Sequence, residues 1–126
     1  MAEKLVLVVD DEEGMRHILA LTLALELNVR VESAIDGEDA LRQIQARKPD
    51  LVVLDMMMPK VDGFAVCRAL KADPATRHIP IVGVTAIHDG ELLQMALAAG
   101  CNDLLGKPFN LDDFSDRVKE WLATTL

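Results

Sequence analysis

The sequence is poor in aromatic and basic residues and has no long apolar run. It contains no Tyr, one Trp and three Phe, and its formal net charge is −8 at pH 7. An acidic chain repels nucleic-acid phosphates, and no basic face with interleaved aromatic residues is present, so we expect no binding of DNA or RNA. A membrane span needs roughly 18 uncharged residues in a row, and no stretch approaches that, so we expect no membrane contact.

Cysteine is scarce as well. Cys67 and Cys101 lack the spacing of a paired or metal-binding motif, so we expect two reduced thiols that pack as small apolar side chains. Met1 is followed almost at once by a predicted strand, without the apolar region of a signal peptide. These features predict a cytoplasmic protein. The length of 126 residues predicts a single domain over residues 1–126.

Strand and helix patterns alternate along the chain, which is typical of βαβ units and a parallel sheet. The predicted strands are 4–9, 29–33, 51–54, 80–84 and 104–106, and the predicted helices are 14–27, 36–46, 63–72, 90–99 and 111–123. Asp36 is the expected N-cap of the second helix, and Gly100 is the expected end of the fourth. We therefore predict an α/β fold with a doubly wound, five-stranded parallel sheet and five helices.

The first predicted helix carries more apolar surface than one face needs. Its expected core face consists of Met15, Ile18, Leu19, Thr22 and Leu25. A second stripe consists of Ala20, Leu23, Ala24 and Leu27. This second stripe either packs on neighbouring helices or forms a surface for a partner protein.

Four predicted strands run into polar residues, which are Asp10 with Asp11, Asp55, Thr85 and Lys107. Parallel strands share one carboxyl edge, where open α/β sheets bind ligands, so we expect these side chains to converge. A single Asp after a strand is more often a helix N-cap, and a single Lys there is usually solvated. The conjunction of four complementary strand ends favours a functional site.

Three adjacent carboxylates ionise together only when a cation offsets their charges. An all-oxygen ligand set suits Mg²⁺, whereas a softer metal would need His or Cys, and His17, His78 and His88 fall outside the strand ends. Lys107 together with Mg²⁺ would form a clamp for a phosphoryl group, and Thr85 could donate a hydrogen bond to it.

The motifs that carry a family resemblance are Asp10-Asp11, Asp55-Met-Met-Met-Pro59, Asp62-Gly63, Thr85-Ala86 and Lys107-Pro108-Phe109. In this order and spacing they resemble the receiver domain of two-component response regulators, of the stand-alone single-domain type. The resemblance extends from Lys4 to about Leu122. It implies a flavodoxin-like sheet with strand order 2-1-3-4-5.

The resemblance also implies a role for each site residue. Asp55 would accept a phosphoryl group from a sensor histidine kinase or a histidine phosphotransfer protein. Asp10, Asp11, Asp55 and the backbone carbonyl of Met57 would hold Mg²⁺. Lys107 would pair with Asp55 and then with the phosphoryl group, the Lys107–Pro108 bond would be cis, and Thr85 would move toward the phosphoryl oxygen.

The implied function is a phosphorylation-activated signalling module that switches protein–protein contacts with a downstream target. It is no enzyme beyond its own phosphoryl transfer and slow autodephosphorylation, and this chain carries no DNA-binding output domain. We expect a monomer or a phosphorylation-dependent dimer through the fourth and fifth helices.

Four positions stand out against the family pattern. Leu104 stands where the family usually has Tyr or Phe, which is either a neutral replacement or a sign of altered output. Met57 and Ile87 flank the phosphoryl position and cannot orient a water, so we predict slow hydrolysis of the phosphoaspartate. Lys60 is either a surface residue or a charge that partners meet.

Three other functions are weaker alternatives. A Mg²⁺-dependent phosphohydrolase usually needs a second acid near its nucleophile, but three Met follow Asp55. A nucleotide- or flavin-binding module needs a Gly-rich loop after the first strand, where Glu12 and Glu13 stand. A metal-binding scaffold that is never phosphorylated would not need Lys107 and Thr85.

Overall fold

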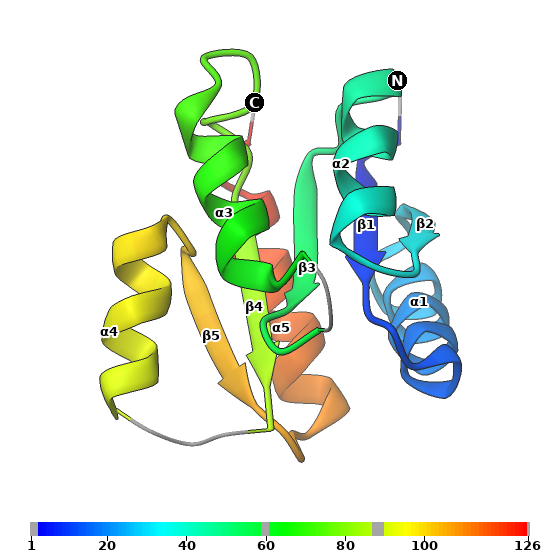
Figure 1. The fold of residues 1–126 in the computed structure, drawn as a ribbon. Coiled ribbons are helices and arrows are strands. Elements are labelled where there is room, and N and C mark those ends of the chain that lie inside the picture. Colours follow the sequence, from blue (N-terminus) through cyan, green and yellow to red (C-terminus); the bar gives the residue numbers. More distant parts are fainter. Residues whose placement is uncertain (1–2, 59–60, 87–89, 126) are drawn as a thin grey trace.

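The computed structural model describes residues 3–58, 61–86 and 90–125. Its strands are β1 (Leu5–Val9), β2 (Arg30–Ala34), β3 (Leu51–Asp55), β4 (Ile81–Thr85) and β5 (Asp103–Gly106). Its helices are α1 (Glu13–Leu27), α2 (Gly37–Ala46), α3 (Gly63–Ala72), α4 (Gly90–Ala99) and α5 (Leu111–Leu122). All strand pairs are parallel, in the order β2-β1-β3-β4-β5 (Figure 1), which confirms the predicted fold class.

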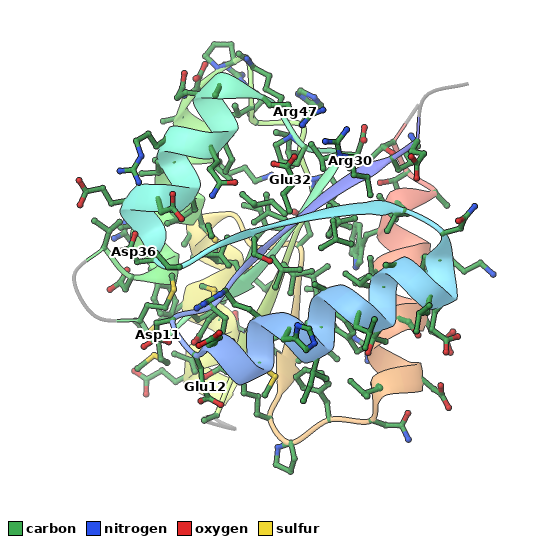
Figure 2. All side chains as sticks on the ribbon, turned by 90° about the vertical axis from the view of Figure 1, so that its right-hand side faces the viewer. Asp11, Glu12, Arg30, Glu32, Asp36 and Arg47 are labelled. Atoms are coloured by element: carbon green, nitrogen blue, oxygen red, sulfur yellow. The ribbon has the colours of Figure 1, made fainter. Side chains whose placement is uncertain are left out.

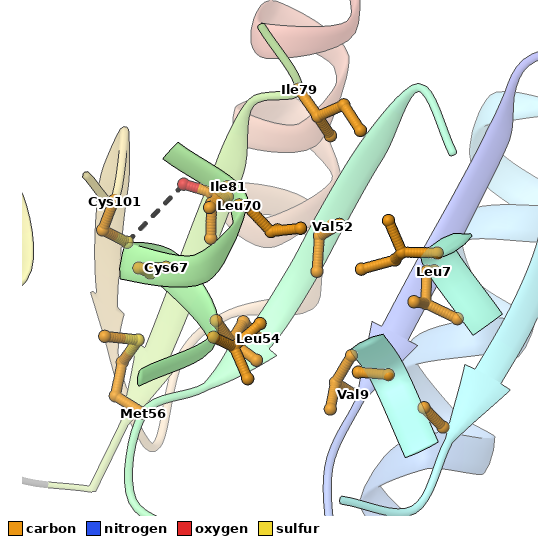
Figure 3. Close-up of a cluster of buried hydrophobic side chains, with 14 of the residues drawn as sticks. Leu7, Val9, Val52, Leu54, Met56, Cys67, Leu70, Ile79, Ile81 and Cys101 are labelled. Atoms are coloured by element: carbon orange, nitrogen blue, oxygen red, sulfur yellow. Dashed lines mark hydrogen bonds between the residues drawn. The ribbon is translucent and has the colours of Figure 1, made fainter. Parts of the chain in front are cut away.

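The sheet separates two hydrophobic cores because successive side chains of a strand point to opposite faces. In β1, Val6 and Val8 join the core under α1 and α5, while Leu7 and Val9 join the core under α2, α3 and α4. Figure 3 shows part of the second core, with side chains of β1 and β3 packed against helices. Burial on both faces explains why β1, β3 and β4 are almost continuous apolar runs.

Capping residues set several helix boundaries. The Asp36 side chain accepts the Asp39 N–H at 2.8 Å, which confirms Asp36 as the N-cap of α2. Asn110 caps α5 in the same way. Gly100 has a φ of +114°, a backbone conformation that favours glycine, and ends α4 where the sequence predicts. The predicted elements agree with the observed ones to within one residue at either end.

The edge strand β2 is protected by charge. Arg47 Nη1 lies 2.8 Å from Glu32 Oε1, and Arg30 Nη2 lies 3.6 Å from the same atom. Figure 2 shows these three side chains grouped beside the strand. Charged side chains on an edge discourage pairing with a strand of another chain.

The predicted core face of α1 was partly wrong. Ile18 and Leu25 are 47% and 75% exposed. The side chains that pack into the core are Met15, Leu19, Leu23 and Leu27. Because α1 is apolar nearly all round, two stripes fit a helical period, and only contact with the sheet selects the buried one. None of the described helices combines the length and apolarity that crossing a membrane requires.

Candidate functional site

The carboxyl edge of the sheet brings the predicted polar residues together. Asp55 and Thr85 are the last residues of β3 and β4, and Asp10 and Lys107 directly follow β1 and β5. Asp10, Asp55 and Thr85 are all buried, at 1%, 6% and 1% exposure. Buried carboxylates are rare without a partner, so their position at a shared edge marks this place as the candidate site.

Lys107 is the cation that the structure pairs with these carboxylates. Its Nζ lies 3.2 Å from Asp10 Oδ2 and 3.9 Å from Asp55 Oδ2. The ammonium group thus bridges the two buried acids and lies closer to Asp10 than to the predicted partner Asp55. The Lys107–Pro108 peptide bond is cis, as predicted.

Asp11 completes an acidic cluster, by which we mean Asp10, Asp11 and Asp55. One carboxylate oxygen from each lies within 4.8 Å of the others. Asp11 is exposed and lies beside Glu12 at the start of α1 (Figure 2), so the cluster has one open side. Three oxygen ligands around one point form a set that could hold a hard cation. His17 and His78 do not belong to it.

Burial perturbs the carboxyl group of Asp55. Loss of solvation raises the pKa of Asp55 to about 6, and the negative charges of Asp10 and Asp11 add to that rise. A hydrogen bond from the Met57 N–H to Asp55 Oδ1, at 3.0 Å, and the charge of Lys107 act in the opposite direction. A cation bound in the cluster would favour the ionised form.

The backbone after β3 is held close to the site. The Gly63 N–H donates to the Met56 carbonyl at 3.3 Å. A Cβ at Gly63 would lie 2.5 Å from Met56 Cα and 2.7 Å from the Asp55 carbonyl oxygen, so only glycine permits this approach. The start of α3 therefore fixes the loop that carries Met57.

Thr85 and Lys107 are joined through the backbone. The Lys107 N–H donates to the Thr85 carbonyl at 2.6 Å, so a displacement of Thr85 acts directly on the end of β5. Leu104 pairs with Gly83 in the β4–β5 ladder and packs, partly buried, against the core that contains Met56. Pro59, Lys60, Ile87 and His88, which the sequence analysis also named, lie outside the described residues.

Two supports of Asp10 were not expected from the sequence. The Glu12 N–H donates to Asp10 Oδ1 at 2.9 Å, and Arg16 Nη1 donates to the Asp10 carbonyl oxygen at 2.9 Å. An Arg six residues after a strand-end Asp is a faint signal, because only the turn into α1 brings the two together.

Comparison with known proteins identifies the family. Residues 6–119 match the response regulator receiver domain. This chain belongs to the response regulator receiver domain family. It is therefore a receiver domain of two-component signalling, and the family consists of phosphoacceptor signalling modules. The family resemblance inferred from the strand-end motifs is confirmed.

Solved receiver structures share the whole fold. The chemotaxis protein CheY4 of Vibrio cholerae superposes with a TM-score of 0.88 at 30% identity, covering 94% of this chain and 98% of that one. A putative response regulator from Chloroflexus aurantiacus superposes with a TM-score of 0.90 at 34% identity, covering 98% and 99% of the two chains.

Curated relatives are longer proteins. The response regulator PleD of Caulobacter vibrioides is 45% identical over 106 residues, which are 83% of this chain and 23% of PleD. The probable transcriptional regulator ycf27 of Cyanophora paradoxa is 40% identical over 123 residues, which are 98% of this chain and 50% of ycf27. The chain thus spans between about a quarter and a half of the length of these two relatives.

Proposed function

We propose that Asp55 accepts a phosphoryl group from a phosphohistidine of a partner protein and that this switches the contacts of the receiver domain. The observation that carries the proposal is a buried carboxylate at the end of β3, 3.9 Å from the Lys107 ammonium and grouped with two further carboxylates. Such a site offers a nucleophile, a fixed positive charge and an all-oxygen metal cradle at once.

The acidic cluster fits Mg²⁺ as the cofactor. Its ligands are carboxylate oxygens, one side is open, and two of its three acids are buried beside the Lys107 ammonium. We propose that Asp10, Asp11, Asp55 and the Met57 carbonyl hold the ion. When bound, Mg²⁺ offsets the negative charge of the carboxylates and of the incoming phosphoryl group.

The transfer step is a displacement at phosphorus. A carboxylate oxygen of Asp55 attacks, a P–O bond forms, and the P–N bond to the donor imidazole breaks. The imidazole leaves with the electron pair of that bond and takes up a proton, so neutral histidine remains on the partner. Lys107, already within 3.9 Å of Asp55, would move its charge to a phosphoryl oxygen.

Thr85 is the proposed reporter of phosphorylation. Its hydroxyl would donate to a phosphoryl oxygen, and the 2.6 Å hydrogen bond between its carbonyl and the Lys107 N–H would carry the displacement to β5. Phosphorylation adds about −1.5 to −2 charge at one point, enough to bias two conformations that differ by a few kcal/mol. Leu104, where the family usually has an aromatic ring, is either a neutral replacement or a sign of altered output through α4, β5 and α5.

We propose slow autodephosphorylation as a property of this site. Met57 is half-exposed and apolar beside Asp55, so its side chain offers no hydrogen bond to an attacking water. The proposal predicts that Met57→Asn shortens the lifetime of the phosphoaspartate, whereas an unchanged and rapid loss in both proteins would refute it.

The phosphodonor is proposed to dock beside the site on α1. An apolar groove of about 210 Å³ is lined by Met15, Ile18, Lys107, Pro108, Phe109 and Leu111. Lys107 belongs to both groove and site, so a helix laid on the groove places its histidine near Asp55. The exposed Leu25, two turns after Ile18, extends this apolar surface along α1. A sensor histidine kinase or a histidine phosphotransfer protein is the proposed donor, and a further protein is the downstream target.

The proposal also covers the domain organisation, the catalytic scope and the cellular location of the protein. Residues 1–126 form one receiver domain, monomeric or dimerising on phosphorylation. It catalyses only its own phosphoryl transfer and slow dephosphorylation. The two free, buried cysteines support a cytoplasmic location, where thiols remain reduced.

Incubation with Mg²⁺ and acetyl phosphate tests the proposal directly. Intact-mass measurement should find one added phosphoryl group in the wild type and in Asp116→Asn, which alters an exposed acid of α5. Asp55→Ala should gain none. An adduct on Asp55→Ala, or no adduct on the wild type even with histidine kinases, would overturn Asp55 as the acceptor.

A further inference from the structure

Two cysteines that are far apart in the sequence meet inside the molecule. Cys67 lies in α3, and Cys101 lies between α4 and β5. Both are free and buried, at 0% and 4% exposure, and their side chains are hydrogen-bonded to each other. Figure 3 shows the two side chains gathered in the core beside Ile81 of β4. No other pair of cysteines exists in the sequence.

Backbone carbonyl groups surround the Cys101 sulfur in the closed fold. Its sulfur lies 2.9 Å from the Asp103 carbonyl oxygen and 3.6 Å from the Ile81 carbonyl oxygen, and Figure 3 marks the second contact. A Cβ added at Gly83 would lie 2.9 Å from the same sulfur, so the absence of a side chain at Gly83 makes room for the thiol.

We propose that Cys67 and Cys101 are a redox modification site. A small-molecule disulfide such as glutathione disulfide would oxidise them to an intramolecular Cys67–Cys101 disulfide. The bond would tie α3 to the junction of α4 and β5. In a reducing compartment the bond would be transient, as regulatory disulfides there are.

The two thiols have unequal roles in this reaction. The hydrogen bond from Cys67 lowers the pKa of the Cys101 thiol, whereas the same bond and burial raise the pKa of Cys67. The thiolate is the nucleophile. Because Cys101 follows the end of α4, where local opening would expose it, and Cys67 is fully buried within α3, Cys101 is the attacking sulfur and Cys67 the resolving one.

The reaction balances in two exchange steps. The Cys101 thiolate attacks one sulfur of glutathione disulfide, the S–S bond of the oxidant breaks, and the first glutathione leaves and takes up the Cys101 proton. The Cys67 thiolate then attacks the Cys101 sulfur, the new Sγ–Sγ bond forms, and the second glutathione leaves with the Cys67 proton. The protein loses two electrons and two protons, which the oxidant gains.

Helix α4 provides the access that buried thiols need. Its only buried side chains are Ala96 and Ala99, each with a single methyl group. The Cys101 N–H donates to the Ala96 carbonyl at 3.0 Å, so Cys101 is tied to the last turn of α4. An element with few buried apolar atoms opens locally more often than the whole domain unfolds. Opening of this turn would expose Cys101 while α3 stays in place.

The first test uses the unaltered protein with glutathione disulfide. We expect intact mass to fall by two hydrogen atoms, peptide mapping to find Cys67 joined to Cys101, and the thermal midpoint to rise on the order of 10 °C, reversibly with dithiothreitol. A stable glutathione adduct on the wild type, a disulfide between two chains, or two persistent free thiols would overturn the proposal.

Single variants separate the two roles. Cys67→Ala should retain glutathione on Cys101 because the resolving thiol is missing. Cys101→Ala should leave Cys67 unreacted over the time in which the wild type is oxidised. Equal reactivity of the two variants would contradict the assignment, and the peptide map of the wild type decides the linkage if a variant fails to fold.

A matched pair of glycine variants tests whether the thiols are reached through local opening of α4. Ala98 in α4 and Ala24 in α1 are both exposed helical alanines. A helical Gly costs up to about 1 kcal/mol relative to Ala, so Ala98→Gly should speed oxidation by about three- to fivefold through local opening. Ala24→Gly should leave the rate unchanged. Equal acceleration in both would mean that the thiols react only after global unfolding, which would refute a switch in the folded state.

Discussion

Helices α4 and α5 follow one another along the chain on either side of β5 and are held to the sheet in very different ways. Helix α5 buries Phe114, Val118 and Leu122 in the core. Helix α4 buries only Ala96 and Ala99 and exposes Leu93, Met95 and Leu97. Apolar contact area stabilises in proportion to its size, so α5 belongs to the cooperative core and α4 rests on it.

Polar contacts increase the difference between the two helices. Arg117 Nη1 of α5 lies 3.0 Å from both carboxylate oxygens of Asp103, and the indole N–H of Trp121 donates to Asp103 Oδ2 at 3.0 Å. These contacts tie α5 to Asp103, the first residue of β5. The strand that leads to Lys107 is therefore anchored by polar contacts with α5 as well as by apolar packing, whereas α4 is held mainly through two alanines.

The largest expected effect comes from the core of α5. Phe114→Ala removes a fully buried ring and should lower the free energy of unfolding by about 3–5 kcal/mol. Met95→Ala removes a large but half-exposed side chain of α4 and should change it by less than about 0.5 kcal/mol. Urea unfolding of both variants tests this contrast. Similar losses in the two variants would mean that α4 is anchored as firmly as α5.

The next largest effect on the free energy of unfolding comes from the ionisation of the buried Asp55 carboxyl group. The pKa of Asp55 is raised to about 6 from an ordinary value of 3.8, chiefly by burial. The unfolded chain therefore binds fewer protons than the folded one between these pH values, and stability is lost as pH rises through about 6. Without Mg²⁺ at pH 8, Asp55→Asn should be more stable than the wild type by about 2–3 kcal/mol.

The pH dependence provides the control for Asp55→Asn. Well below pH 3.8, where Asp55 is protonated in both the folded and the unfolded state, the variant and the wild type should be equally stable. Glu26→Gln, an exposed carboxylate at the far end of α1, should show no such difference at either pH. A variant less stable than the wild type at pH 8 would show that ionised Asp55 stabilises the fold.

Mg²⁺ should stabilise the acidic cluster by a smaller amount. At ten times the dissociation constant, a bound ion adds about 1.4 kcal/mol to the free energy of unfolding. Affinity should fall as pH drops through about 6, because protons compete for Asp55. Thermal melts with and without Mg²⁺ measure the effect, which Asp11→Asn should weaken and Glu12→Gln, a neighbouring exposed acid, should retain. Equal losses in both variants would contradict Asp11 as a ligand.

The sequence predicts features that depend on neighbouring residues and misses those that depend on contacts between distant segments. Continuous apolar runs predict β1, β3 and β4, and the polar residues at the strand ends predict the candidate site, because both signals are local. In α1 the apolar surface surrounds the helix, so the period alone selected Ile18 and Leu25 as core residues, wrongly. The meeting of Cys67 with Cys101 and the closeness of Lys107 to Asp10 depend on contacts between distant segments, which spacing cannot reveal.

The smallest expected effects on the free energy of unfolding come from one substitution in α5 and one in α4, which have similar intrinsic costs. Asn110 caps α5 by accepting the N–H groups of Asp112 and Asp113 at 2.7 and 3.2 Å, and Asn110→Ala should cost about 1 kcal/mol. Ala98→Gly in α4 should cost up to about 1 kcal/mol. If α5 opens only with the whole domain, the loss of its cap lowers the stability of every slowly exchanging amide.

In α4, the destabilisation caused by Ala98→Gly should affect only the amides of that helix. Ala98→Gly should speed hydrogen exchange of α4 amides up to about fivefold and leave the slowest amides of β1 and β3 unchanged, since those amides exchange only on global unfolding. Asn110→Ala should speed those core amides by a similar factor. If Ala98→Gly also accelerates the core amides, then α4 unfolds with the rest of the domain, and its two buried alanines are sufficient to join it to the cooperative core.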